Sequence, residues 1–407
     1  MTASSDEPQS TTAFIAVTMA FMINMIGTTL PTAIYRYYQQ QYGFTPTVIT
    51  VIYACYAIGV IGALLVVGNW SDQLGRRRML LSGLCASAAS AVTFLLSHGL
   101  WGLMLGRLLS GISAGIFTGT ATVAVIELAP AVWRRHATLA ATASNMLGLG
   151  CGPLLSGVLV ELLPWPMRLP YAVHLLMVGA AVLAVLSAPE TAKLPDRVKL
   201  GLQRISLPTE VRSAFVPAAM AGFAGFVVVG FFAAVAPQLI GVVLGYHSGI
   251  VIGMIVFLLF ACSAFGQMMQ AKIAAHWRQP IGCVGLIAGL LGVALCVPYR
   301  SLDALIIGTI LAGIGQGISF RAGLGDIAAK SPPHRRAEVT SSFFVVLYVA
   351  ISLPVIGLGI AVQVAGIQRA TLIFAGLTIG LVFFALLLLL RRQTGRVREA
   401  DAASGYR

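Results

Sequence analysis

The chain has 407 residues, of which 58% are apolar and only 10% are charged, and its formal net charge is +13. Soluble proteins carry about 25% charged residues, so this composition excludes a soluble globular protein and indicates an integral membrane protein. A positive excess would suit a nucleic-acid partner, but the distribution of the charge, described below, excludes that function.

The hydropathy pattern predicts twelve membrane-spanning helices, since a helix needs about 20 apolar residues to cross the hydrocarbon core. Loops between them are short, which leaves no room for a soluble domain. The predicted fold is an all-α membrane protein with two six-helix bundles. The spans cover 12–33, 47–67, 79–97, 100–127, 137–162, 170–188, 213–240, 247–270, 280–298, 303–328, 338–363 and 367–390.

Basic residues gather on one side of these spans. If the N-terminus is cytoplasmic, only four of the 26 Lys and Arg fall in outer loops: Arg36, Arg168, Arg300 and Arg369. This asymmetry follows the positive-inside rule and places both termini in the cytoplasm. The start of the chain carries Asp6 and Glu7 where a signal peptide would be positive, so we expect the first span to be retained.

The two halves of the chain resemble each other. The shift that brings Gly111 onto Gly313 also brings Pro130 onto Pro332, and Pro153 falls one residue from Pro354. This indicates a duplicated six-helix unit, with a substrate site near the midplane where the halves face each other. We predict bundles over 1–188 and 213–390, a cytoplasmic linker over 189–212 and a tail over 391–407.

The loop between the second and third spans carries the strongest motif, with Gly68, Asp72, Gly75 and Arg76 in the pattern G-x3-D-x2-G-R-R. It resembles the loop between helices 2 and 3 of the major facilitator superfamily of secondary transporters. That resemblance implies a conformational latch in which Arg76 pairs with Glu127, while Asp72 meets the region from Arg336 to Ser341. The alternatives are a positive-inside loop with a capping Asp, and unrelated surface ion pairs.

Arg107 lies inside the fourth span, about 10 Å from its outer end at 1.5 Å per residue. An arginine at this depth faces a cavity or a partner, or snorkels to the surface. With Gly111 and Gly115 it resembles a superfamily motif associated with proton coupling. The first span lacks the acid that related proton-driven exporters often carry there, and it offers Asn24, Thr28 and Thr29 instead.

The fifth span contains Gly148, Gly152, Pro153 and Gly157, and this run resembles a motif of antiport exporters in the same superfamily. Ser156 replaces one of the motif's glycines. A stripe of small residues allows close helix packing, which is also the simpler alternative. The Pro-Glu pair at Pro189 and Glu190 supports membership in the superfamily.

Several polar residues in the spans are candidates for a substrate cavity, each individually weak. Arg321 either lines the pathway or pairs with Asp326. No nucleotide-binding motif, metal-ligand cluster or disulfide framework is visible. The full set of cavity candidates is Asn24, Tyr53, Tyr56, Asn145, Gln238, Gln316, Arg321 and Tyr348.

The resemblance implies a secondary transporter of the bacterial inner membrane, similar to twelve-helix drug/proton antiporters. We expect export of a small molecule in exchange for protons by alternating access, with the bilayer as surroundings, no cofactor or metal, no nucleic acid, and a monomer. Uptake or facilitated diffusion of a metabolite is the first alternative. A membrane enzyme or sensor is the second, but no catalytic constellation supports it.

Overall fold

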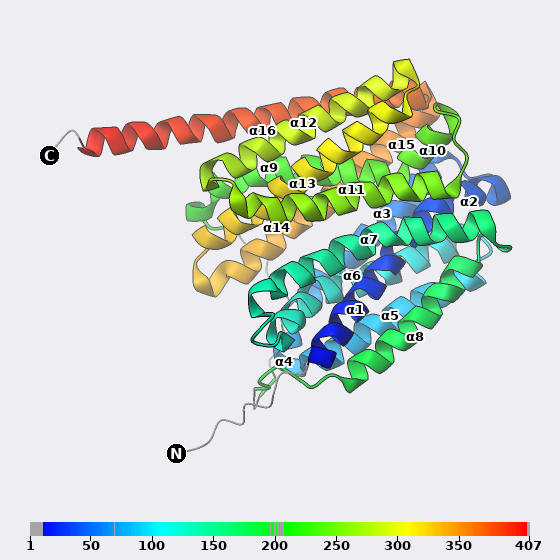
Figure 1. The fold of residues 1–407 in the computed structure, drawn as a ribbon, viewed down its shortest axis with the longest axis horizontal. Helices are drawn as coiled ribbons and strands as arrows, with labels where there is room; N and C mark the ends of the chain where they lie inside the picture. The colour runs from blue at the N-terminus through cyan, green and yellow to red at the C-terminus, as the bar shows by residue number, and fades with distance from the viewer. Residues whose placement is uncertain are drawn as a thin grey trace. The chain divides into compact units, whose positions relative to one another are not determined.

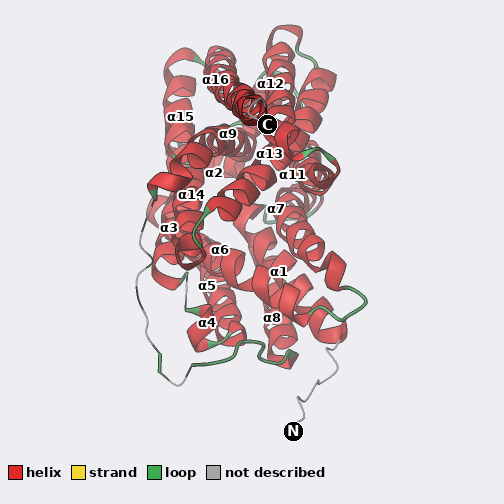
Figure 2. Cartoon of the chain, turned by 90° about the vertical axis from the view of Figure 1, so that its left-hand side faces the viewer, coloured by secondary structure: helices red, strands yellow, loops and turns green. Residues whose placement is uncertain are grey.

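The computed structural model describes residues 11–404 apart from 69, 196, 199, 200, 202, 204 and 206. In this part of the chain every regular element is a helix (Figure 2). The α-helices are α1 Thr11–Thr29, α2 Tyr35–Tyr42, α3 Pro46–Val67, α4 Ser71–Leu74, α5 Arg76–Leu96, α6 Leu100–Leu128, α7 Ala137–Leu162, α8 Leu169–Ser187, α9 Thr209–Ala234, α10 Ala236–Val242, α11 Gly249–Met269, α12 Ala275–Tyr299, α13 Leu302–Lys330, α14 Arg336–Ala350, α15 Leu353–Ala365 and α16 Ile367–Ser404. Short 3-10 helices cover Leu30–Ala33, Arg134–His136, Gln270–Lys272 and Pro333–Arg335.

Twelve helical stretches in the described residues are long and apolar enough to cross a membrane. Eight of the α-helices each form one such span without a 3-10 extension or a break, namely α3, α5, α6, α8, α9, α12, α13 and α16. The prediction of an all-helical, twelve-span membrane protein is therefore confirmed.

Two of the predicted spans are interrupted where the sequence places a proline. The helix predicted over 213–240 ends at Ala234, and α10 starts with Pro237 in its first turn. The helix predicted over 338–363 ends at Ala350, and α15 starts with Pro354 in its first turn. A proline has no amide hydrogen for the preceding turn and clashes with its carbonyl, so each chain segment restarts as a new helix.

The chain divides into two compact units. The first contains 1–204 and 247–257, and the second contains 205–246 and 258–407. The first half of α11 therefore belongs to the first unit. Parts of the predicted linker over 189–212 and of the predicted tail over 391–407 lie outside the described residues, and the domain boundaries given above stay predictions.

In the first unit α1 packs against α6, α7 and α8, while α6 also packs against α3 and α5 (Figure 1). In the second unit α13 packs against α9 and α12, and α16 packs against α9, α12 and α15. The contact of α12 with α13 is built from glycines: a Cβ on Gly289 would meet Ala312, and one on Gly315 would meet Leu286. Small residues are expected at this contact. In lipid the hydrophobic effect does not drive helices together, so their association depends on close van der Waals packing.

Candidate functional site

The loop that carries the Gly68–Arg78 pattern joins α3 to α5 in the first unit. Its single helical turn, α4, is followed by Gly75, whose φ of 103° is a conformation that L side chains rarely adopt. A Cβ at Gly75 would also meet the carboxylate of Glu190. Glycine is therefore required at this position both for the turn and for the close approach.

Arg76 is the centre of a charged cluster in this loop, and the residue is only 8% exposed. Its Nη1 lies 2.5 Å from Asp72 Oδ1 and donates to Ser71 Oγ at 2.7 Å. Its Nε and Nη2 donate to the carboxylate of Glu127 at 3.3 and 3.2 Å. The Asp72 side chain is 66% exposed and that of Glu127 is 33% exposed. The guanidinium thus joins α4, α5 and α6.

Glu190 and Thr191 complete the cluster from beyond the end of α8. The Glu190 carboxylate accepts hydrogen bonds from the amides of Arg76 at 2.7 Å and Arg77 at 3.1 Å. It therefore satisfies two of the free amides at the start of α5, where the helix dipole favours a negative charge. The Thr191 hydroxyl donates to Glu127 at 2.6 Å.

Gly68 provides a second contact between the loop region and the predicted linker. The amide of Gln203 donates to the Leu65 carbonyl at 2.7 Å. A Cβ on Gly68 would collide with the Gln203 carboxamide. The glycine is therefore needed for close approach, not for an unusual φ, since its φ is −54°.

Arg107 lies inside the first unit and is only 1% exposed. Its Nη1 donates to the Thr28 carbonyl at 2.5 Å and its Nη2 to the Tyr53 carbonyl at 3.4 Å. The guanidinium carbon lies 5.2 Å from the centre of the Tyr53 ring and 4.8 Å from that of Tyr56, within the range of cation–π attraction. The side chain is held by carbonyls of α1 and α3 and by two aromatic rings.

Other polar side chains are buried around the same helices. Ser113 Oγ lies 2.8 Å from Asn24 Oδ1, and Ser87 Oγ lies 3.2 Å from His174 Nε2. Six buried polar atoms of the first unit have no hydrogen-bond partner within the described residues: Asn24 Nδ2, Tyr35 Oη, Arg36 Nε, Trp70 Nε1, Arg107 Nε and His174 Nδ1. Buried polar atoms are normally hydrogen-bonded, so these six atoms are exceptions within the unit.

The glycines of the fifth span pack against two different helices. A Cβ on Gly148 would come within 2.6 Å of the Met22 carbonyl of α1. A Cβ on Gly152 would meet the Ile26 carbonyl, and one on Gly157 would meet the Gly249 carbonyl at the start of α11. The run thus places α7 in backbone contact with α1 and with the part of α11 that belongs to the first unit.

Pro153 lies in the middle of α7, yet this helix continues from Ala137 to Leu162. Pro153 supplies no amide hydrogen for the Leu149 carbonyl four residues earlier. The Thr29 hydroxyl of α1 donates to that carbonyl at 2.6 Å instead. A side chain from another helix therefore replaces the missing backbone hydrogen bond.

The far end of α7 makes a polar contact with the start of α11. Glu161 accepts hydrogen bonds from Ser248 Oγ at 2.6 Å and from the Ile250 amide at 2.9 Å. The guanidinium of Arg36 donates to the His247 carbonyl next to it. No sequence motif predicts this cluster, because its members come from three separate segments.

The remaining candidates lie on α7, α10, α13 and α14. Asn145 is half-buried on α7. In the second unit, Gln238 is half-buried on α10 and Tyr348 on α14 packs its ring against Phe226 at 6.2 Å between centroids. On α13, Gln316 Oε1 accepts a hydrogen bond from the Ser263 hydroxyl at 2.6 Å. Arg321 of the same helix is half-buried. Asp326 accepts a hydrogen bond from the Gln279 side chain at 2.6 Å. No group of three or more His, Cys, Asp and Glu that could hold a metal ion occurs in the described part of the chain.

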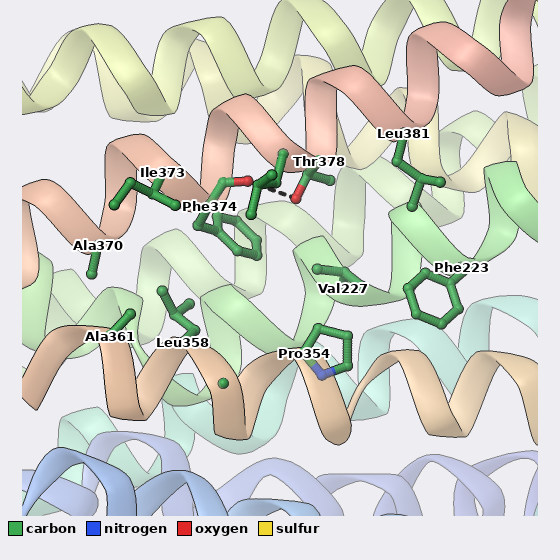
Figure 3. Close-up of a pocket in the computed structure, with 12 residues that line it drawn as sticks. Phe223, Val227, Pro354, Leu358, Ala361, Ala370, Ile373, Phe374, Thr378 and Leu381 are labelled. Atoms are coloured by element: carbon green, nitrogen blue, oxygen red, sulfur yellow. Dashed lines mark hydrogen bonds between the residues drawn. The ribbon is translucent and has the colours of Figure 1, made fainter.

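The second unit has an apolar groove of about 300 Å³ between α9, α15 and α16 (Figure 3). Phe223 and Val227 of α9 and Phe374 and Thr378 of α16 are among the residues that line it. The Thr378 hydroxyl donates to the Phe374 carbonyl of its own helix at 2.8 Å, so it offers no free hydrogen-bond donor. The groove suits apolar groups and supplies no means of recognising a polar one.

The role of Glu190 at the start of α5 has no signature in the sequence. The Pro-Glu pair indicates only membership in a family, whereas the Glu190 carboxylate accepts a hydrogen bond from the Arg76 amide, 114 residues away along the chain. Tyr35 and His174 belong to no motif in the sequence, although both are buried in the first unit.

Within the described residues, twelve helical stretches are long and apolar enough to cross a membrane, and the Arg107 cation is buried inside one of the units. A charged residue within a membrane span is typical of transport pathways. A family model of the Major Facilitator Superfamily matches residues 12–353. The chain belongs to this superfamily.

Two curated relatives are bacterial proteins named for drug resistance. The chain is 28% identical to the tetracycline resistance protein, class D, of Salmonella ordonez, over 44% of each chain. It is 28% identical to multidrug resistance protein 1 of Bacillus subtilis, over 40% of this chain and 42% of that one. The chain spans less than half the length of these relatives.

The fold is also that of solved transporters. A bacterial homologue of the human lysosomal transporter Spinster, in an inward-facing and unoccupied conformation, matches with a TM-score of 0.72 and 15% identity, over 95% of this chain and 99% of that one. At this identity the likeness establishes the fold alone.

Proposed function

We propose that this protein exports a small molecule across the bacterial inner membrane, in exchange for protons, by alternating access. The observation that carries export is the Gly148–Gly157 run, whose residues Gly148, Gly152 and Gly157 pack on the backbones of α1 and α11. Relatives named for tetracycline and multidrug resistance support the same direction. Both termini are then cytoplasmic, as the positive-inside rule requires, and the protein acts as a monomer.

The cluster around Arg76 serves as a conformational latch in this proposal. The Glu127 carboxylate holds the Arg76 guanidinium, and the Glu190 carboxylate accepts from the Arg76 amide, so both hold the start of α5 in place. Asp72 is two-thirds exposed, so part of its carboxylate is accessible to a further partner. We propose the start of α14, from Arg336 to Ser341, as that partner, because a carboxylate is stabilised at a helix N-terminus.

Proton coupling passes through the surroundings of Arg107 in this proposal. The guanidinium is buried among α1, α3 and α6, where it lies close to any proton-carrying or substrate group that enters this part of the unit. Uptake or facilitated diffusion is the second candidate function. It is favoured by the described part of α1, which carries no acid that would pair with Arg107.

Inside-out membrane vesicles test the proposal. Respiration acidifies the lumen, and a panel of drugs and metabolites is added while a pH-sensitive dye is read. We expect one compound to collapse the gradient only when the protein is present, and Asp72→Asn to remove this effect at normal protein abundance. Asp303→Asn is the matched control, because it removes an exposed carboxylate from the start of α13.

Two results would contradict the proposal. Transport at the wild-type rate by Asp72→Asn would refute the latch. Faster equilibration of labelled metabolites without any proton movement would favour the facilitator function over export.

A further inference from the structure

Arg107 forms no ion pair with a carboxylate within the part of the chain that the structure describes. The guanidinium is 1% exposed, so water does not compensate it either. An ion removed from water is strongly disfavoured unless it is paired and hydrogen-bonded.

The hydrogen bonds of this guanidinium are also incomplete. Arginine has five N–H donors in a planar fork. One Nη donates to the Thr28 carbonyl and the other, at 3.4 Å, to the Tyr53 carbonyl, while Nε has no partner. Carbonyl dipoles and the two tyrosine rings attract the cation but do not neutralise it.

Tyr35 provides a second unused donor in the same region. Its hydroxyl is buried and has no hydrogen-bond partner within the described residues. Burial raises the pKa of this phenol, and the nearby charge of Arg107 opposes that rise. The group therefore keeps its proton at neutral pH and remains able to donate it in a hydrogen bond.

From these observations, we propose that Arg107 and Tyr35 bind the anionic group of the transported molecule, a carboxylate or sulfonate. Both classes of anion have two or more oxygens that match the fork of a guanidinium, and the Tyr35 hydroxyl supplies a further donor. The rings of Tyr53 and Tyr56 flank the cation and offer apolar surface to the part of the molecule next to the charge. The substrates are then organic anions. This inference rests on the proposed transport function and specifies its cargo.

An anionic cargo also explains why α1 needs no acid. In this arrangement the counter-charge of Arg107 is delivered by the cargo and leaves with it. A membrane potential that is negative inside drives an anion outward, and 100 mV sustains about a 50-fold concentration ratio for one charge. Export of the anion is therefore favoured by the potential as well as by protons.

Binding to the purified full-length protein in detergent micelles tests the inference without requiring transport. The probes are the sodium salt of 2-naphthoate, its neutral isostere 2-naphthamide, and sodium chloride and sodium sulfate as inorganic anions. The readout is the midpoint temperature of thermal unfolding. We expect 2-naphthoate to raise the midpoint, with an affinity at least about tenfold above that of 2-naphthamide.

Three variants and a control assign the effect to the site. Arg107→Gln should abolish the stabilisation by 2-naphthoate, and Arg107→Lys should retain part of it because the charge remains. Tyr35→Phe keeps the ring and its packing and should weaken binding about three- to tenfold by removing one donor. It tests the site even if Arg107→Gln fails to fold. Arg168→Gln, which removes an exposed arginine, should bind as the wild type does.

Each remaining outcome overturns the inference. Equal binding of 2-naphthamide, or 2-naphthoate binding that persists in Arg107→Gln and Tyr35→Phe, would show that the anion is not recognised here. Stabilisation by chloride or sulfate alone would mean an inorganic ion site instead of a cargo site.

The vesicle assay separates this inference from the proposed function. Binding of 2-naphthoate that depends on Arg107, with no compound transported, would leave the anion site intact and refute export. Export of neutral compounds by Arg107→Gln at the wild-type rate would leave export intact, but it would refute both the anion site and the role of Arg107 in proton coupling.

Discussion

The hydrogen bond from Thr29 to the Leu149 carbonyl predicts a specific effect of Thr29→Val. Valine has nearly the same shape as threonine, so the substitution removes the hydroxyl donor and little else. The Leu149 carbonyl then loses its 2.6 Å partner, while Pro153 still supplies no amide hydrogen. We expect the free energy of unfolding to fall by about 1–2 kcal/mol, the cost of one unsatisfied buried acceptor.

Two further variants make the comparison internal to the protein. Thr18→Val on the same helix removes a hydroxyl whose bond goes to the Phe14 carbonyl of its own helix, so it should change the free energy by less than about 0.5 kcal/mol. Pro153→Ala restores an amide hydrogen for the Leu149 carbonyl. In that background Thr29→Val should cost no more than the control.

Equilibrium unfolding in mixed micelles, followed by the helical circular dichroism signal, measures these free energies. The double-mutant cycle of Thr29→Val with Pro153→Ala should give a coupling of about 1 kcal/mol. A coupling of zero, or a Thr29→Val effect equal to that of Thr18→Val, would show that the hydroxyl does not replace the missing backbone bond.

Three other predictions concern the loop cluster and the packing of α7. Glu127→Gln should lower the free energy of unfolding by about 1–2 kcal/mol. Asp72→Asn should lower it by less than about 0.5 kcal/mol, because the Asp72 side chain is far more exposed. Equal losses in the same unfolding assay would contradict the view that Glu127 is the stronger partner of Arg76. Gly152→Ala should destabilise by about 1–3 kcal/mol because its Cβ meets the backbone of α1. Gly179→Ala, which faces open space, should be neutral or stabilising by up to about 1 kcal/mol, and the reverse order would refute the packing argument. Glu161→Gln should speed hydrogen exchange at the Ile250 amide, which donates to the Glu161 carboxylate. If mass spectrometry shows unchanged protection of this amide, the contact does not hold the start of α11.

Hydropathy alone predicted the number of spans, because each span must be apolar over its whole length to cross a bilayer. It did not predict the breaks near Val235 and Ile351. Proline is tolerated within a membrane helix when other groups satisfy the freed backbone atoms. Pro153 and Pro354 both stand in apolar stretches of the sequence, yet the helix continues through Pro153 and a new helix begins at Leu353, just before Pro354.

The candidate site was predictable only in part, for a similar reason. The position of Arg107 within a span follows from counting residues along the chain. Its partners are backbone carbonyls and the faces of two rings, which leave no pattern in a sequence. The cap provided by Glu190 and the unused hydroxyl of Tyr35 depend on contacts between distant segments, so they require the structure.

The two related prolines give the halves of the chain different mechanical properties. Pro153 is bridged by Thr29, so α7 is a single stiff rod over its 26 residues. At the corresponding position of the second half the helix stops at Ala350 and resumes at Leu353, which leaves a joint between two shorter rods. The two prolines therefore leave one helix of 26 residues in the first half and two helices, of 15 and 13 residues, in the second.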